Sequence, residues 1–216
     1  MQTAKFGEEV PGYSIPVLNE REIRASAGIL FVLMLISLML IIFRNNFLMI
    51  KYVIIFFLLD MIIRVFINPR YSPALIVGRI MVTRQNPEYV GAAQKRFAWM
   101  IGVALSAMMF VLMVVLNSYS IFTGLTCLVC LTFLFFESAF GICLGCVAYK
   151  WFYKEKAQYC PGEICDVKAK QEIQKISWKQ VMIVMAFLAM IILMTNITSD
   201  FMSEKPRDLW KILNLK

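Results

Sequence analysis

Five long apolar runs dominate this chain of 216 residues. A helix needs about 20 mostly apolar residues to cross the hydrocarbon of a bilayer, and each run approaches that length. Hydrophobic residues make up 60% of the chain and charged residues 17%, which is far more apolar than a soluble domain. We therefore predict an all-α polytopic membrane protein: a four-helix transmembrane bundle plus one additional C-terminal transmembrane helix. The predicted spans are residues 27–43, 47–67, 98–116, 121 to about 149, and 178 to about 198.

The polar segments between the runs define the domain organisation. The predicted parts are an N-terminal segment (1–26), a four-helix membrane domain (27–151), a cysteine-containing loop (152–177), the fifth helix (178–198) and a tail (199–216). Lys and Arg concentrate in the N-terminal segment and in the two long connections, which all fall on one face of the membrane. Because positively charged loops stay inside, we expect a cytoplasmic N-terminus and an external C-terminus. Contact with anionic lipid headgroups then explains the net charge of +8, and no nucleic-acid partner is expected.

The fourth run ends with the sequence ESAFGICLGCVAY (137–149), which contains the Cys-x-x-Cys pair Cys143 and Cys146. Cys160 and Cys165 form another pair in the polar loop that follows. A cytoplasmic position keeps thiols reduced, so a permanent disulfide is not expected. Two uses stay open for the four residues as catalytic or ligating groups. They exchange with a disulfide, persulfide or other sulfur carrier, or they hold zinc or an iron–sulfur cluster.

Two observations limit these uses. The chain has no histidine, so any metal would need thiolate or carboxylate ligands. Buried cysteine is also a good small hydrophobe, which leaves plain packing open for Cys143 and Cys146. Packing is our expectation for a further Cys-x-x-Cys pair, Cys127 and Cys130, because apolar residues flank it in the middle of the fourth run. Apart from that possible metal, no cofactor is expected.

Charged residues inside the apolar runs are costly and need partners. Asp60 and Arg64 are four residues apart in the second run, so we predict an ion pair on one helix face. Glu137, Gly141 and Gly145 would share one stripe of a continuous fourth helix, and the two glycines form a Gly-x-x-x-Gly pattern for close helix packing. Glu137 should therefore face another helix, where it pairs with Arg64 or stays protonated beside a hydrogen-bonded neighbour.

The connection between the second and third runs contains a further short helix, predicted over residues 74–83. Its apolar residues alternate with Arg79 and Arg84, which is typical of a helix that lies on the membrane surface. Together with Arg70, these arginines would bind lipid phosphates, or they would help to dock an acidic soluble protein of the thioredoxin-like kind.

Three segments resemble a family of small bacterial membrane proteins, domain of unknown function 4395. They are VLNEREIRASAG, NPRYSPALIVGRIMVTRQNPEYVGAAQKRFAWMIG and FESAFGICLGCVAY, and the resemblance covers about residues 15–151. It implies four transmembrane helices in a bacterial inner membrane and makes Cys143 and Cys146 part of the family pattern. It supplies no activity. Cys160, Cys165 and the fifth helix lie beyond it, so a metal site of four cysteines would be specific to this chain.

Our leading hypothesis is a thiol/disulfide or sulfur-transfer component of the membrane. In it Cys143 and Cys146 form the embedded pair, and Cys160 and Cys165 exchange with a sulfur-carrier or thioredoxin-like protein. The alternative is a small transporter or an accessory subunit in which the cysteines only pack. Under that alternative, substitution of Glu137, Asp60 or Arg64 should impair function, and substitution of the cysteines should not. A quinone-linked disulfide enzyme fits less well, because such enzymes usually act on the oxidising face. The substrate and the oligomeric state do not follow from the sequence.

Overall fold

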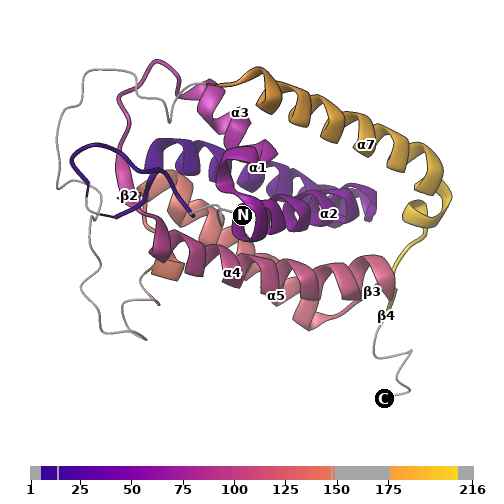
Figure 1. Cartoon of the computed structure of the whole chain (residues 1–216). Helices are drawn as coiled ribbons and strands as arrows, with labels where there is room; N and C mark the ends of the chain where they lie inside the picture. The colour runs from indigo at the N-terminus through magenta and orange to yellow at the C-terminus, as the bar shows by residue number, and fades with distance from the viewer. Residues whose placement is uncertain (1–5, 14, 147, 149–175, 209–216) are drawn as a thin grey trace.

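The computed structural model describes residues 6–13, 15–146, 148 and 176–208. Most of these residues form helices that run back and forth between two ends of a bundle (Figure 1). The α-helices are α1 (Glu20–Arg44), α2 (Leu48–Ile62), α3 (Pro73–Met81), α4 (Ala92–Met109), α5 (Ile121–Phe135) and α7 (Trp178–Ser203). Helices α2, α4 and α5 continue as the π-helical segments η1 (Ile63–Ile67), η3 (Phe110–Val115) and η4 (Phe136–Phe140), and η2 (Pro69–Tyr71) is a 3₁₀ turn.

Four helices of the described chain are long and apolar enough to cross a membrane: Glu20–Arg44, Ala92–Val115, Ile121–Phe140 and Trp178–Ser203. The second predicted span forms α2 and η1 but is not among the four, since Lys51, Asp60 and Arg64 lie within it. All three side chains are buried among the other helices. The protein is thus an all-α polytopic bundle with an additional C-terminal helix, as the apolar runs predict.

The two ends of the bundle differ in chemistry. Helices α1 and α4 begin at one end, where η1 and η4 also finish, and we call it the ionic end because buried charged side chains meet there. The buried ones are Glu20, Glu22, Asp60, Arg64, Arg79 and Lys95, and the partly buried Glu137 joins them. We call the opposite end the turn end. There Asn45 closes α1 in the left-handed conformation (φ 50°), and its neighbour Asn46 accepts a hydrogen bond from the Leu48 N–H, which starts α2.

Apolar side chains fill the centre of the bundle between α1, α2, α4 and α5. They include Leu30, Met34, Ile54, Phe57, Met61, Met109, Cys127, Cys130 and Leu134. Large apolar residues also cover the outside of the same helices, for example Val32, Ile42, Val111, Phe122 and Leu128. Such an outer surface is suited to lipid rather than water.

The ends of two helices differ from the sequence prediction. Helix α1 begins at Glu20 and not near residue 27, because Asn19 caps it by accepting the Arg21 N–H at 3.2 Å. The fourth helix ends at Phe140 and not near residue 149. Gly141 takes a left-handed conformation (φ 66°), which stops the helix in the way a glycine commonly does.

Short elements close the two ends. Strand β1 (Val17–Asn19) pairs antiparallel with β2 (Tyr89–Gly91) next to the ionic end, and β3 (Ser118–Tyr119) pairs in parallel with β4 (Arg207–Asp208) at the turn end. Helix α3 was predicted on the membrane surface, but it packs against the first turns of α1. A Cβ atom added at Gly78 would lie 2.6 Å from the Glu22 carbonyl oxygen, so glycine allows this backbone contact.

Candidate functional site

Lys95 joins three helices at the ionic end. Its Nζ atom lies 2.8 Å from Glu20 Oε2 and donates to Glu137 Oε1 at 2.5 Å. The side chains are 3%, 1% and 15% exposed, respectively. Of the two alternatives for Glu137, pairing with Arg64 is wrong, because α4 starts at Ala92 and so carries Lys95 into the bundle as its partner. Two carboxylates therefore share one buried ammonium group.

The predicted pair of Asp60 and Arg64 is present and fully buried, with 2.7 Å between Arg64 Nη2 and Asp60 Oδ2. Asp60 Oδ1 also accepts the Ser72 hydroxyl at 2.6 Å and the Ala74 N–H at 2.9 Å, so it ties the start of α3 to α2. The guanidinium carbon of Arg64 lies 5.2 Å from the centre of the Trp99 ring on α4. The ion pair therefore links α2 to α3 and α4, in addition to neutralising the two buried charges.

Arg79 does not face lipid phosphates as expected. It is buried and lies 3.0 Å from Glu22 Oε2, while Glu22 Oε1 accepts the Asn19 side-chain amide at 3.0 Å. The same contacts hold α3 on α1.

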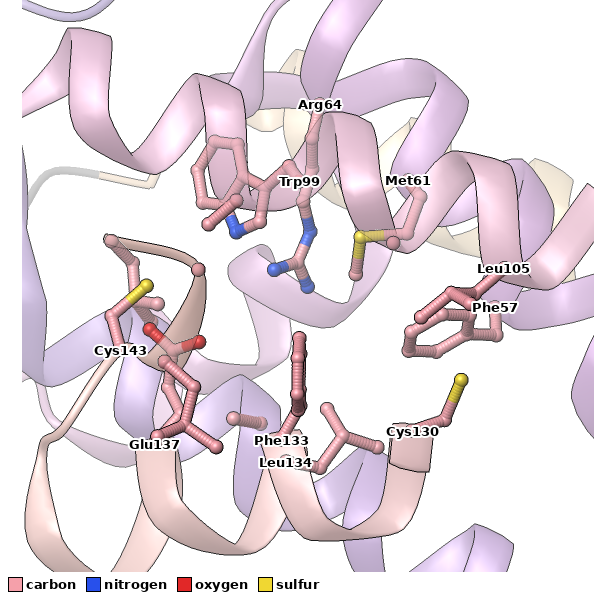
Figure 2. A pocket seen from close by; sticks show the side chains of 16 residues that line it. Phe57, Met61, Arg64, Trp99, Leu105, Cys130, Phe133, Leu134, Glu137 and Cys143 are labelled. Carbon is pink, nitrogen blue, oxygen red and sulfur yellow. The ribbon is translucent and has the colours of Figure 1, made fainter. Parts of the chain in front are cut away.

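A cavity of about 50 Å³ lies between these charged groups and the apolar core (Figure 2). Arg64 and Trp99 line one side, and Glu137 and Cys143 lie together on another. Cys130 lies at the far end of the cavity from Cys143, as Figure 2 shows. The space is large enough for a water molecule, for which these polar groups are suitable partners. The cavity therefore brings a thiol, a carboxylate and a guanidinium from distant parts of the chain to one place.

Cys143 and Cys146 lie just beyond the end of η4. Cys143 is buried and Cys146 is partly exposed, and both are free thiols. The backbone N–H of Cys146 lies 2.9 Å from the Cys143 carbonyl oxygen and 3.3 Å from its sulfur, so the two residues occupy one turn. The interaction with the Cys146 side chain, then burial and the charge of Glu137, raise the pKa of the Cys143 thiol well above its ordinary value. Cys143 is therefore a neutral thiol near pH 7.

Gly141 and Gly145 do not share one helical stripe, since the helix ends before Gly141. Each nevertheless allows a close approach. A Cβ atom at Gly141 would lie 3.2 Å from the Arg24 guanidinium, and one at Gly145 would lie 2.5 Å from the Ala98 Cβ on α4. The Gly-x-x-x-Gly prediction was thus wrong in its geometry, although both glycines lie at tight contacts.

Cys160 and Cys165 lie outside the described residues, and so does any site built on them. Within the part of the chain that is described, no three His, Cys, Asp or Glu side chains are grouped so as to hold a metal ion. The zinc or iron–sulfur site of four cysteines stays a prediction.

The sequence interpretation missed Glu20, Glu22 and Lys95 as members of the site. They lie three to seven residues before an apolar run, about one to two helical turns, and resemble ordinary loop charges. A usable signal was present: Asn19 followed three residues later by Glu22 is similar to a capping box, which marks the start of a helix before the apolar run begins.

Comparison with known proteins gives one result. The family described as Domain of unknown function (DUF4395) matches residues 18–154. No curated protein and no solved structure gives a significant match. The matched segment begins in β1 and includes the bundle from α1 to η4, the ionic end, Cys143 and Cys146, whereas α7 lies outside it. Since the match covers more than half of the chain, this protein belongs to the DUF4395 family.

Proposed function

We propose that this membrane protein carries out thiol–disulfide exchange at the ionic end of the bundle, with Cys143 and Cys146 as the reacting pair. The observation that supports this most directly is the position of the pair. The two residues lie in one turn, and Cys143 opens on the cavity that Glu137 also lines. Paired thiols in one turn can alternate between a dithiol and a disulfide.

The partly exposed Cys146 is the residue that meets the soluble carrier. Its thiolate attacks one sulfur of a carrier disulfide, which releases the first carrier thiolate and leaves a mixed disulfide. Cys143 then attacks the Cys146 sulfur, releases the second carrier thiolate and closes a Cys143–Cys146 disulfide. Two protein thiols are oxidised, the carrier disulfide is reduced to two thiols, and the two protons move to the carrier. The reverse sequence reduces the protein pair.

Glu137 would help the second step. A thiol with a raised pKa attacks only when a neighbouring base accepts its proton. The Glu137 carboxylate lines the same cavity as Cys143 and is held in place by Lys95. In this proposal Cys160 and Cys165 are a second pair of thiols that exchanges with the same thioredoxin-like or sulfur-carrier protein.

The proposal places the ionic end at the cytoplasmic face of a bacterial inner membrane, with the C-terminus outside. The Lys and Arg distribution supports this orientation. A cysteine introduced by Asn46→Cys at the turn end should react with a membrane-impermeant maleimide from outside intact cells. Reaction only after the cells are opened would reverse the orientation.

The test uses purified full-length protein incubated with glutathione disulfide, followed by mass spectrometry of the cysteine peptides. We expect a Cys143–Cys146 disulfide and its loss in Cys143→Ser and Cys146→Ser. The pair Cys127 and Cys130 has the same spacing but lies in the apolar core at 4% and 5% exposure, so it serves as a matched control and should stay reduced. Metal analysis of the same sample tests the alternative zinc or iron–sulfur site. Equal behaviour of the two pairs would refute the proposal.

A second candidate function is a small transporter or an accessory subunit in which the cysteines only pack. The buried ion pairs at the ionic end favour it, because intramembrane charges commonly mark transport pathways. It predicts that all described cysteines remain thiols under every redox condition, and that replacing the four cysteines of both proposed pairs by serine changes nothing.

A further inference from the structure

Helix α7 lies outside the matched family segment, and hydrogen bonds attach it to the bundle at both of its ends. At the ionic end the fully buried Gln180 donates its side-chain N–H to the Arg70 carbonyl at 3.0 Å. At the turn end the buried Lys51 ammonium donates to the carbonyls of Met202 at 3.2 Å and Glu204 at 2.7 Å. Lys51 thus satisfies carbonyl groups that a helix C-terminus leaves unpaired. Polar bonds fix where both ends of α7 lie.

Between these two attachments α7 and α2 leave a groove of about 430 Å³. Figure 1 shows the course of the two helices. Tyr52, Phe56 and Leu59 of α2 form one wall, and Phe187, Met190 and Met194 of α7 form the other. Phe56 and Phe187 meet edge to face with 5.3 Å between their ring centres.

The groove is long and apolar, and one of its walls is α7, a helix long and apolar enough to cross a membrane. Its α2 wall runs from Met49 to Leu59, about 15 Å at 1.5 Å per residue, which is roughly half the hydrocarbon thickness. A void with apolar walls excludes water and loses dispersion contacts unless an apolar molecule enters it. The methionines of the walls are flexible and can adapt to such a molecule.

We propose that this groove binds one acyl chain of a membrane phospholipid from the leaflet at the turn end. An acyl chain matches the length and apolarity of the groove. Two exposed cations, Lys205 and Arg207, follow Met202 of the groove along the chain, and they would attract the phosphate of the bound lipid. The bound acyl chain fills the groove and so packs against both α7 and α2 between the two polar attachments. This inference does not depend on the proposed thiol chemistry.

The test reconstitutes the full-length protein into phosphatidylglycerol–phosphatidylcholine vesicles that contain a phosphatidylcholine with a diazirine in its acyl chain. After illumination, labelled residues are mapped by mass spectrometry. We expect several-fold more label on Met190 and Met194 than on Ile192 and Leu193. The latter two lie on the same helix outside the groove and are 61% and 59% exposed, so they report ordinary boundary lipid.

Two variants make the test specific. Met194→Trp fills the groove and should remove the excess label from Met190, whereas Leu193→Trp adds the same side chain outside the groove and should leave it unchanged. Met190→Ala enlarges the groove without filling it and should move label to Phe56. Equal labelling of both faces of α7 would mean boundary lipid only, and a groove without label would mean that α7 closes on α2 or that another molecule occupies the space. Either result overturns the proposal.

Discussion

The ionic end and the turn end of this bundle are stabilised by different interactions. At the ionic end, buried ion pairs and backbone contacts at glycine join α1, α2, α3, α4 and η4. At the turn end, a lysine and two short strands attach α7 beside an open apolar groove. The tightly bonded end belongs to the matched family segment, and the loosely packed helix does not. The difference teaches that the matched family segment keeps many buried polar contacts at one end of its helices, whereas α7 is attached by few hydrogen bonds.

Removing Lys95 should have the largest effect. Lys95→Ala leaves the buried Glu20 and the partly buried Glu137 without their shared cation, and breaking a buried pair such as Lys95 and Glu20 costs about 3–5 kcal/mol. Thermal unfolding of the purified protein in detergent measures the loss. Arg21→Ala is the matched control, because the pair of Arg21 and Glu88 is 35% and 39% exposed and is worth about 0–1 kcal/mol. Similar losses in the two variants would mean that the ionic end is not stabilised by burial of its charges.

Gly78→Ala should have the next largest effect. The added Cβ would lie 2.6 Å from the backbone oxygen of Glu22 and 3.0 Å from the Ser26 nitrogen, so α3 has to move away from α1. Overpacking of this kind costs about 1–3 kcal/mol. Gly124→Ala in α5 is the same substitution with no atom within 4 Å, and the helix preference for alanine should stabilise it by up to about 1 kcal/mol. Opposite signs in thermal unfolding are expected, and equal signs would contradict the close contact of α3 and α1.

Lys51→Met should act on α7 alone. It removes two hydrogen bonds from the turn end of that helix, worth about 1–3 kcal/mol together, while the apolar side chain fills the same space. Hydrogen exchange should become faster in α7 and stay unchanged in α1 and α4. Faster exchange throughout the bundle would show that α7 is part of the cooperative core and not an attached helix.

The smallest effect concerns pH. The pKa of Cys143 is raised in the folded protein above its ordinary value of 9.0, so the folded state holds this proton more tightly than the unfolded state does. The resulting stability is complete below pH 9 and is lost as the pH rises through the folded-state pKa. The free energy of unfolding should therefore decrease above pH 9 more steeply in the wild type than in Cys143→Ser. Parallel curves would mean that Cys143 is not held as a neutral thiol.

Much of the fold follows from the sequence because hydropathy alone marks a membrane helix. All five apolar runs form helices, and the pair of Asp60 and Arg64 follows from their spacing. The helix ends do not follow, for two reasons. Helices α1 and α4 begin with polar stretches that contain Glu20 and Lys95, which are buried as ions. Hydropathy therefore places the start of each helix too late in the sequence. At Gly141 the opposite occurs, since the sequence stays apolar through Phe140 and Ile142 although the helix is interrupted there.

These errors at the helix ends decided how well the site could be predicted. Cys143 and Cys146 are identifiable from spacing and family pattern, but a continuous helix would have placed Glu137 far from the end of the bundle. With the helix ended at Phe140, Glu137 lies at the ionic end, where Lys95 reaches it. The partner of a buried charge depends on which helices are neighbours, and spacing along one helix does not contain that information.

The central claim is that the pair Cys143 and Cys146 changes redox state while the pair Cys127 and Cys130 only packs. The most direct measurement counts thiols in native membranes with a mass-tagged maleimide, before and after treatment with a reductant, in Cys143→Ser/Cys146→Ser and Cys127→Ser/Cys130→Ser variants. We predict a reductant-dependent gain of two tags that disappears only in the first double variant. Full labelling of all cysteines without reductant, under both oxidising and reducing growth, would contradict the claim and leave Glu137 and Lys95 as the residues to explain.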